Sequence, residues 1–473
     1  MVAATSGQNS VTVAHPLRKI LGLGFGLAFA FGSVVGVGIL RLPGMVAAAA
    51  GSPILIVLCW CIGALYALMG AASVSELATM YPEAGGFRVY ARRAFGDRAG
   101  FVVGWIDWLA TVATLAYAAV TAVEFVGTLW PGITQYGAAA AIVVLGAFTA
   151  MQSFGLRIGS TVTSVASATV GILLLLFILR CFLVLPVTLP AGFAARAVTA
   201  RHSLSVGALL ALVPAIRAIL TAYDGWYAPI YTAEECVDAS RTIPRSIMGG
   251  AFLVGALYVT LNVALLRVLP VPVLAASSLP VAAASRVVLP HGSALLITGL
   301  SILIVLGLIN GNVISGPRIL LSMAREGWIP HKAASVSLGG TPRVALMITT
   351  LTSSAMILTG TFNQLIALFA VLILLCYISA FLAVFVLRHR LRDAPRPYRA
   401  FGYPVATFVV LCGSVVFLII AVMKDWRSGV MALLFLILCV PAYAFASRSR
   451  LARVGESACN RAGEPIASTG KPR

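Results

Sequence analysis

Apolar segments of membrane-spanning length follow one another along almost the whole chain. About 20 apolar residues cross the hydrocarbon core of a bilayer as a helix, so this pattern predicts roughly twelve spans. They cover residues 20–46, 53–78, 99–129, 136–154, 159–186, 204–231, 246–269, 291–323, 343–360, 363–388, 403–423 and 428–447. A transmembrane β-barrel would show short segments of alternating polarity instead. The pattern therefore predicts an all-α polytopic membrane protein.

Two of these spans are interrupted by glycine in a way that disfavours a continuous helix. The first span contains Gly32, Gly36 and Gly38, and the sixth contains the pair Asp224-Gly225. Glycine costs about 1 kcal/mol per position inside a helix, and backbone freed in lipid must find partners within the protein. Small-xxx-small helix packing is the alternative for the first set. Two interrupted segments at corresponding places in two halves favour a transporter's binding site.

The two predicted breaks would form a site with two chemically different halves. The half-helix that starts after the first break presents free N–H groups and a positive dipole end, which suits a carboxylate. The break in span 6 runs the other way and leaves carbonyl groups to accept from an ammonium group. The two halves together describe an α-amino acid. The predicted substrate-binding residues are Ser33, Val34, Gly36, Val37, Gly38, Ile39, Thr221, Ala222, Tyr223, Asp224 and Trp226.

Composition and charge agree with a membrane protein. The chain is 60% apolar and 10% charged, against about 45–50% and about 25% in soluble domains. Its formal charge of +19 comes mostly from Lys and Arg in alternate loops and the tail, which places both termini in the cytoplasm and argues against nucleic-acid binding. Residues 1–17 and the basic, disordered 448–473 would be cytoplasmic tails, and the first span would stay uncleaved. The excess of Arg over Lys and the lack of an N-x-[ST] acceptor are typical of a bacterial inner membrane.

Ionisable side chains inside the predicted spans are functional candidates, because each costs at least about 2.5–3.5 kcal/mol there. Arg41 follows the first break, and Arg217 lies about two helical turns before Asp224. Snorkelling towards the outer surface is the favoured interpretation for both. The alternatives are that they draw in an anionic substrate side chain or that Arg217 pairs with Glu124. Asp107 lies near the start of span 3 between two Trp residues, so we expect an interfacial role for it.

Acids near the predicted cytoplasmic ends of the spans are expected to form inner salt bridges. Glu76 in span 2 is expected to pair with Arg88 or Arg92. Three acids of the loop after span 6 are expected to face the basic loop after span 8: Glu234, Glu235 and Asp238. Such pairs would change partners between transport states, and ordinary solvated loop charge is the alternative.

Five motifs, in order, resemble those of amino acid–polyamine–organocation permeases. They are Gly32–Pro43, Tyr81–Tyr90 (YPEAGGFRVY), Ala222–Trp226 with Ile243–Arg245, Asn310–Gly311 with Gly316–Arg318, and Arg396–Arg399 with Gly402–Pro404. The resemblance implies the LeuT-like permease fold, with alternating access around a site between spans 1, 3, 6, 8 and 10. Its five-plus-five inverted repeat would cover about 20–186 and 204–388, followed by two extra helices at about 403–447.

The chain departs from the family pattern at three places. Val37 stands where many relatives carry Ser, and Thr221 stands where a gating aromatic is common, so occlusion would rely on Trp226 or Tyr223. The stretch Ser167–Gly171 lacks the Lys that replaces a sodium ion in some relatives, which leaves coupling to H⁺, coupling to Na⁺ or uncoupled exchange open. The candidates for gating or specificity are Arg41, Tyr117, Arg217 and Asn310.

The sequence thus predicts a secondary amino-acid transporter, a symporter or exchanger, without cofactor, structural metal or enzyme activity. A nucleotide-binding loop of the G-x-x-x-x-G-K-[ST] type is missing from the sequence, which argues against direct ATP drive. A polyamine or other organic-cation carrier is an alternative that would need extra acids in the site. A non-transporting sensor would need an output domain or a longer tail. The expected partners are a small amino-acid substrate and the lipid bilayer, and the pattern does not define an oligomeric state.

Overall fold

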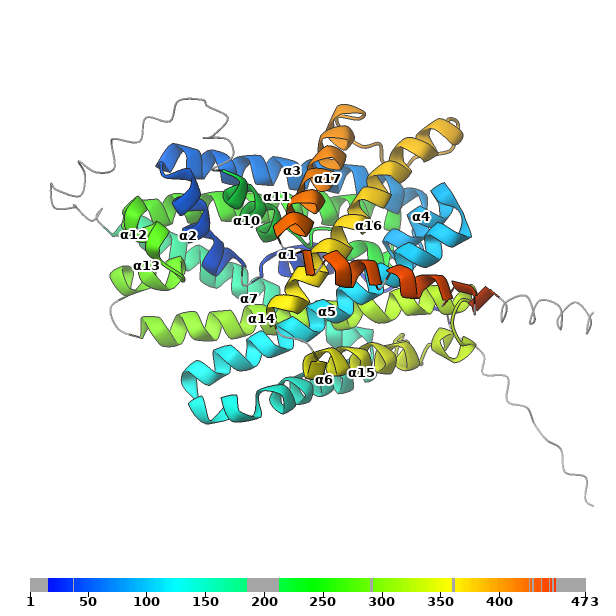
Figure 1. Cartoon of the computed structure of the whole chain (residues 1–473), viewed down its shortest axis with the longest axis horizontal. Coiled ribbons are helices and arrows are strands. Elements are labelled where there is room, and N and C mark those ends of the chain that lie inside the picture. The colour runs from blue at the N-terminus through cyan, green and yellow to red at the C-terminus, as the bar shows by residue number, and fades with distance from the viewer. Residues whose placement is uncertain are drawn as a thin grey trace, which may run out of the picture.

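Long helices account for nearly all of the described chain (Figure 1). This computed structural model describes residues 16–36, 38–184, 212–289, 292–359, 362–424, 426–427, 429–434, 436–441, 443–444 and 446–447. The α-helices are α1 Leu23–Val34, α2 Gly38–Ala50, α3 Pro53–Met80, α4 Phe87–Phe95, α5 Asp97–Leu129, α6 Gly137–Ser153, α7 Leu156–Leu183, α10 Val213–Ala222, α11 Ala239–Val268, α12 Val271–Ala276, α13 Pro280–Val288, α14 Ser293–Arg325, α15 Arg343–Thr359, α16 Phe362–Arg390 and α17 Val405–Lys424. Short 3-10 helices are η1 Pro131–Tyr136, η2 Ala228–Glu235 and η3 His331–Ala334.

The outer helices turn apolar side chains away from the bundle. Exposed apolar residues on α3 recur every three or four positions, which is the spacing of one helix face: Ile54, Leu58, Ile62 and Leu65. A similar stripe runs along α7: Val165, Ile172, Leu176 and Leu179. Soluble proteins rarely expose such continuous apolar surface. In the described part of the chain, 8 helices are long and apolar enough to cross a membrane, or 9 with the bent pair α1 and α2. The protein is therefore an integral, multi-pass membrane protein, whereas the count of twelve spans stays a prediction.

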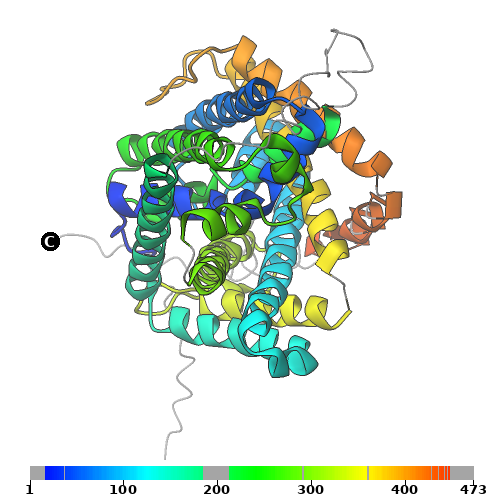
Figure 2. The same cartoon turned by 90° about the vertical axis from the view of Figure 1, so that its left-hand side faces the viewer.

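The long helices pack against one another around the centre of the molecule (Figures 1 and 2). α3 lies along α11, α5 lies along α14, and α1 is held between α11 and α7. α1 and α11 approach closely because a Cβ at Gly26 would collide with Ser246 and one at Gly250 with Ala30, as in other small-residue contacts between membrane helices. The pairs α3–α11 and α5–α14 would be equivalent elements of the two predicted repeats, and the inverted repeat itself stays a prediction.

Short helices cover the two ends of the bundle, and the hydropathy pattern did not predict them. α4 follows a turn at Gly85 and Gly86, whose φ angles of 123° and 62° favour glycine. α12 and α13 pack on α2 at the other end, where a Cβ at Gly44 would lie 2.5 Å from the Ser277 carbonyl oxygen. We call these the α4 end and the α12 end. Residues 204–211 of span 6 and the predicted tails, except for 16 and 17, lie outside the described residues, and the last predicted span is described only in part.

Candidate functional site

The first predicted break is present between α1 and α2. α1 ends at Val34, α2 begins at Gly38, and the two helix axes are bent by 48°. The Val34 carbonyl, which a continuous helix would use internally, accepts a hydrogen bond of 3.0 Å from the Tyr258 hydroxyl on α11. The first N–H groups of α2 have no partner within their helix, as at any helix start. Val37 lies outside the described residues, so its predicted contact with substrate stays a prediction.

The second predicted break follows α10 and lies directly against the first. α10 ends at Ala222, and a turn leads into η2. Gly225 in this turn has a φ of 109°, and a Cβ there would collide with the Ser33 carbonyl of α1. The Asp224 carboxylate accepts a hydrogen bond from the Tyr377 hydroxyl on α16. Among the described residues, none donates a hydrogen bond to the carbonyl oxygens of Ala222 and Asp224.

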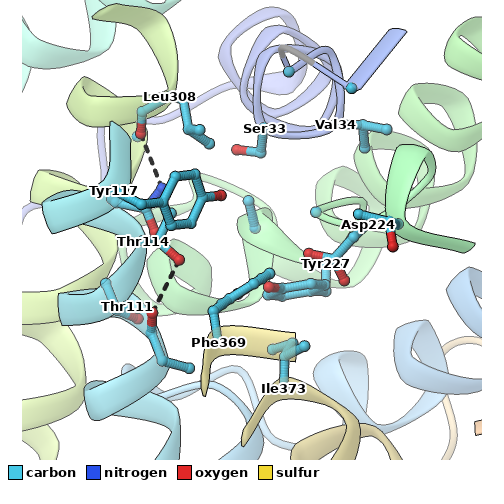
Figure 3. A pocket seen from close by; sticks show the side chains of 18 of the residues that line it. Ser33, Val34, Thr111, Thr114, Tyr117, Asp224, Tyr227, Leu308, Phe369 and Ile373 are labelled. Atoms are coloured by element: carbon cyan, nitrogen blue, oxygen red, sulfur yellow. Dashed lines mark hydrogen bonds between the residues drawn. The ribbon is translucent and has the colours of Figure 1, made fainter. Parts of the chain in front are cut away.

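A cavity of about 260 Å³ lies where the two breaks meet (Figure 3). Its walls come from the two breaks, α5, α14 and α16, which are the five spans that the family resemblance implied. Hydroxyl and amide groups line one side of it: Thr111, Thr114 and Thr121 of α5, and Asn312 and Ser315 of α14. Tyr117 and Phe369 face the same space with ring centroids 6.1 Å apart. The cavity thus combines free backbone groups with a polar wall and two aromatic rings.

Nine of the residues predicted for substrate binding, gating or specificity line this cavity. They are Ser33, Val34, Gly36, Gly38, Thr221, Ala222, Asp224, Arg41 and Tyr117. The Thr221 carbonyl is not wholly free, because the Asp224 N–H lies 3.4 Å from it. Arg41 also lies over the Phe125 ring, with its guanidinium carbon 5.8 Å from the centroid. Sequence reasoning missed Phe369 and Ile373 of α16, since an apolar residue in an apolar span carries no distinguishing signal.

The other predicted residues lie elsewhere. Ile39 is buried behind the cavity wall, and Tyr223 donates a hydrogen bond of 3.0 Å to the Trp60 carbonyl. Trp226 stacks on Tyr377 beside a smaller second cavity, so neither aromatic closes the main one.

The two remaining candidates also lie away from the cavity. The Asn310 amide joins α14 to α6 and α7 through Gln152, the Gly159 carbonyl and Thr163. Arg217 lines neither cavity, and the described residues show no ion pair between Arg217 and Glu124.

Asp107 lies in the cavity, which corrects the interfacial role expected for it. Asp107 is 1% exposed, and its Oδ1 accepts a hydrogen bond of 2.7 Å from the Tyr231 hydroxyl. α5 begins at Asp97, so Asp107 lies about 15 Å into the helix. Arg88 of α4 packs on Gly104 and covers this end of α5. The sequence could not show that cover, because it depends on how α4 folds back.

A layer of ion pairs closes the bundle at the α4 end. Its ion pairs join η2 to α14, α4 to the residue that follows α14, and α3 to α16 and the loop after it. They are Glu235–Arg318, Glu234–Arg325, Glu326–Arg88, Glu326–Arg92, Glu76–Arg388 and Glu76–Arg396. The pairing predicted for Glu234 is thus confirmed by Arg325. Glu235 also forms an ion pair, but with Arg318 inside span 8, and Asp238 pairs locally with Arg241 of α11. The pairing predicted for Glu76 is wrong, because Arg88 and Arg92 bind Glu326 instead. Glu76 faces α16 and pairs with Arg388 and Arg396.

Exposure differs between the two ends of the cavity. Arg41 and Thr221, which line it towards the α12 end, are exposed, whereas Asp107 and Tyr231 at the α4 end are buried. As far as the described residues show, the cavity is therefore open towards the α12 end and closed towards the α4 end.

An uncharged contact fills the place where some relatives carry a Lys. Ser167 of α7 donates a hydrogen bond of 2.7 Å to the Ala28 carbonyl of α1, and a Cβ at Gly32 would collide with the same hydroxyl. The α1–α7 contact is therefore made by a neutral side chain.

Comparison with known proteins gives consistent matches over most of the chain. The family model described as "Amino acid permease" matches residues 26–441. Serine/threonine exchanger SteT of Bacillus subtilis (strain 168) is 27% identical, with 91% of this chain and 98% of the relative covered. Large neutral amino acids transporter small subunit 2 of Oryctolagus cuniculus is 29% identical over 84% and 74%. The human b(0,+)-type amino acid transporter 1 is 27% identical over 86% and 82%.

Proposed function

The chain belongs to the amino acid permease family of the amino acid–polyamine–organocation superfamily, and we propose that it is a secondary amino-acid transporter, a symporter or exchanger. One observation carries the proposal: two helix breaks of opposite direction meet in a cavity that the described residues close at the α4 end and leave open at the α12 end. Relatives that match nearly the whole chain are named as amino-acid exchangers or transporters. The proposal applies that activity to this chain.

Substrate recognition would rest on the backbone of the two breaks. The substrate carboxylate would bind the first N–H groups of α2 beside Gly36 and Gly38, where the helix dipole is positive. The substrate ammonium group would bind the carbonyls of Ala222 and Asp224, which have no other donor among the described residues. A volume of about 260 Å³ lies below the range of about 300–1,000 Å³ for drug-sized ligands. The cavity thus suits a single amino acid.

Alternating access would require the ion pairs at the α4 end to break. The cavity as described is closed by ion pairs that tie α4, α14, α16 and η2 together. Opening the α4 end would break these contacts while the α12 end closes, with Tyr117 and Phe369 placed to cover the substrate. We assign the α4 end to the cytoplasm, because the basic residues of α4 and the neighbouring loops gather there.

A polyamine or other organic-cation carrier is the second candidate, and one observation favours it. Two carboxylates, Asp107 and Asp224, line the cavity, and extra acids are what such a substrate would need. A diamine has no carboxylate, however, and would leave the N–H groups of α2 unused. Uptake measurements separate the two functions.

The test is uptake into proteoliposomes that contain the purified protein. A panel of labelled amino acids and the diamine putrescine is offered with and without imposed pH and sodium gradients, and with internal amino acid to detect exchange. Saturable uptake of amino acids supports the proposal, and the gradients identify the coupling. Uptake of putrescine without uptake of any amino acid would favour the second candidate, and uptake of neither would reject both.

A further inference from the structure

The carboxylate of Asp107 is incompletely satisfied. Oδ1 accepts from the Tyr231 hydroxyl, but Oδ2 has no hydrogen-bond partner in the described part of the structure. The residue is 1% exposed and lines the cavity. An isolated buried carboxylate is costly unless a cation or proton compensates it. Its position at the closed end of an otherwise accessible cavity makes a bound ligand the natural source of that compensation.

Charges around the cavity favour a cation at its closed end. Of the described residues that line it, Arg41 is the only Lys or Arg, and it is exposed at the open end. The ion pairs of the α4 end use their Arg side chains on other acids, with Arg88 bound to Glu326 and Arg318 to Glu235. The Asp107 carboxylate therefore has no protein cation bonded to it among the described residues.

The distance from the breaks to Asp107 fits a long side chain. Thr114 and Asp224 lie on opposite sides of the same space (Figure 3). Asp107 lies two turns from Thr114, or about 10 Å along α5. An extended lysine side chain places its ammonium nitrogen about 6 Å from its Cα at ordinary bond lengths, and a charge-assisted hydrogen bond adds about 2.8 Å. Thr111 of α5 lines the stretch between them.

We infer that Asp107 is a specificity-determining residue that binds the distal ammonium or guanidinium group of a dibasic amino acid. This inference rests on the proposed function, since the α-carboxylate and α-amino groups of that substrate would be held at the two breaks. Tyr231 positions the Asp107 carboxylate and leaves Oδ2 for the substrate. Neutral amino acids would bind the breaks without using Asp107.

Uptake of lysine and of serine by the D107N variant tests this inference. D107N should raise the KM for lysine at least about tenfold, the value of a charge-assisted hydrogen bond, while the KM for serine changes less than about twofold. D107E keeps the charge and should retain part of the preference for lysine. D393N, which changes an exposed acid outside the cavity, should leave both substrates unchanged. D107N should also melt at or above the temperature of the unchanged protein, because an unpaired buried charge is removed.

Each contrary outcome has a distinct meaning. If the unchanged protein transports serine but neither transports lysine nor is inhibited by it, the inference is wrong and the proposed function stands. Equal loss of lysine and serine uptake in D107N, or a changed pH dependence for both, would also overturn it and would assign Asp107 to proton coupling. Absence of uptake for every amino acid would instead reject the proposed function. If D107N does not fold, a loss of lysine preference in D107E decides against the inference.

Discussion

Removing one partner of the Arg318–Glu235 ion pair should destabilise the protein more than removing both. The pair joins α14 to η2, with distances of 2.5 and 2.9 Å from the guanidinium nitrogens to the two carboxylate oxygens. The two side chains are only 3% and 0% exposed. E235Q would leave the Arg318 guanidinium buried without its counterion. R318M would leave the Glu235 carboxylate buried without its counterion. The double variant would leave neither charge.

The burial of this pair sets the expected size of the effect. Breaking a buried pair from one side costs about 3–5 kcal/mol, whereas replacing both partners is often neutral. A chain of this size loses about 2 °C or less in Tm per kcal/mol, so each single variant should melt up to about 6–10 °C lower. The two single variants should also differ, because a buried carboxylate can take up a proton and a guanidinium cannot lose one. The destabilisation caused by R318M should therefore become smaller as the pH falls, and that caused by E235Q should not.

Thermal unfolding of the purified protein in detergent measures these differences. The matched control is R93M, since Arg93 pairs with Glu83 where both side chains are more than 40% exposed, and such pairs contribute about 0–1 kcal/mol. Single variants that melt within about 2 °C of the unchanged protein would refute the reasoning, as would a double variant that melts lower than both. Either result would mean that water reaches the pair.

Three further predictions concern the cavity. G225A should lower uptake at least about tenfold, because the φ of 109° disfavours a side chain and the Ser33 carbonyl leaves no room for a Cβ. The control is G307A on α14, which should keep full uptake because the space around Gly307 is open. G36L should fill the cavity and abolish uptake while membrane expression stays normal. The control G24L should keep its uptake, because the space around Gly24 is open. Normal uptake by G36L would show that substrate binds elsewhere. R41Q removes a positive charge, so it should lower the KM for lysine and raise the KM for glutamate, and salt should reduce both shifts. KM shifts in the same direction for both substrates would show that Arg41 does not act through its charge.

The fold and the two breaks could be predicted from the sequence because their causes are local. Apolar length defines a span, and Gly36 and Gly225 lie in the two breaks, where glycine disfavours helix. Gly32 is helical in α1 and instead allows the close contact with Ser167. The partner of Glu76 and the depth of Asp107 could not be predicted, because both depend on where α4 lies after the Gly85-Gly86 turn. The Trp residues beside Asp107 gave a misleading signal of a membrane interface. Asn310 is polar inside an apolar span, and its amide joins helices instead of lining the cavity.

The contact between Gly225 and the Ser33 carbonyl makes the two breaks a single mechanical joint. No side chain separates their backbones, so one break cannot slide on the other without losing the fit. The groups proposed to hold the two ends of the substrate would then travel together through the transport cycle, and the relative motion would fall to α5, α14 and α16 around them. A pair of spectroscopic labels placed across the joint should report one distance in every state, while pairs from the joint to α5 should report at least two.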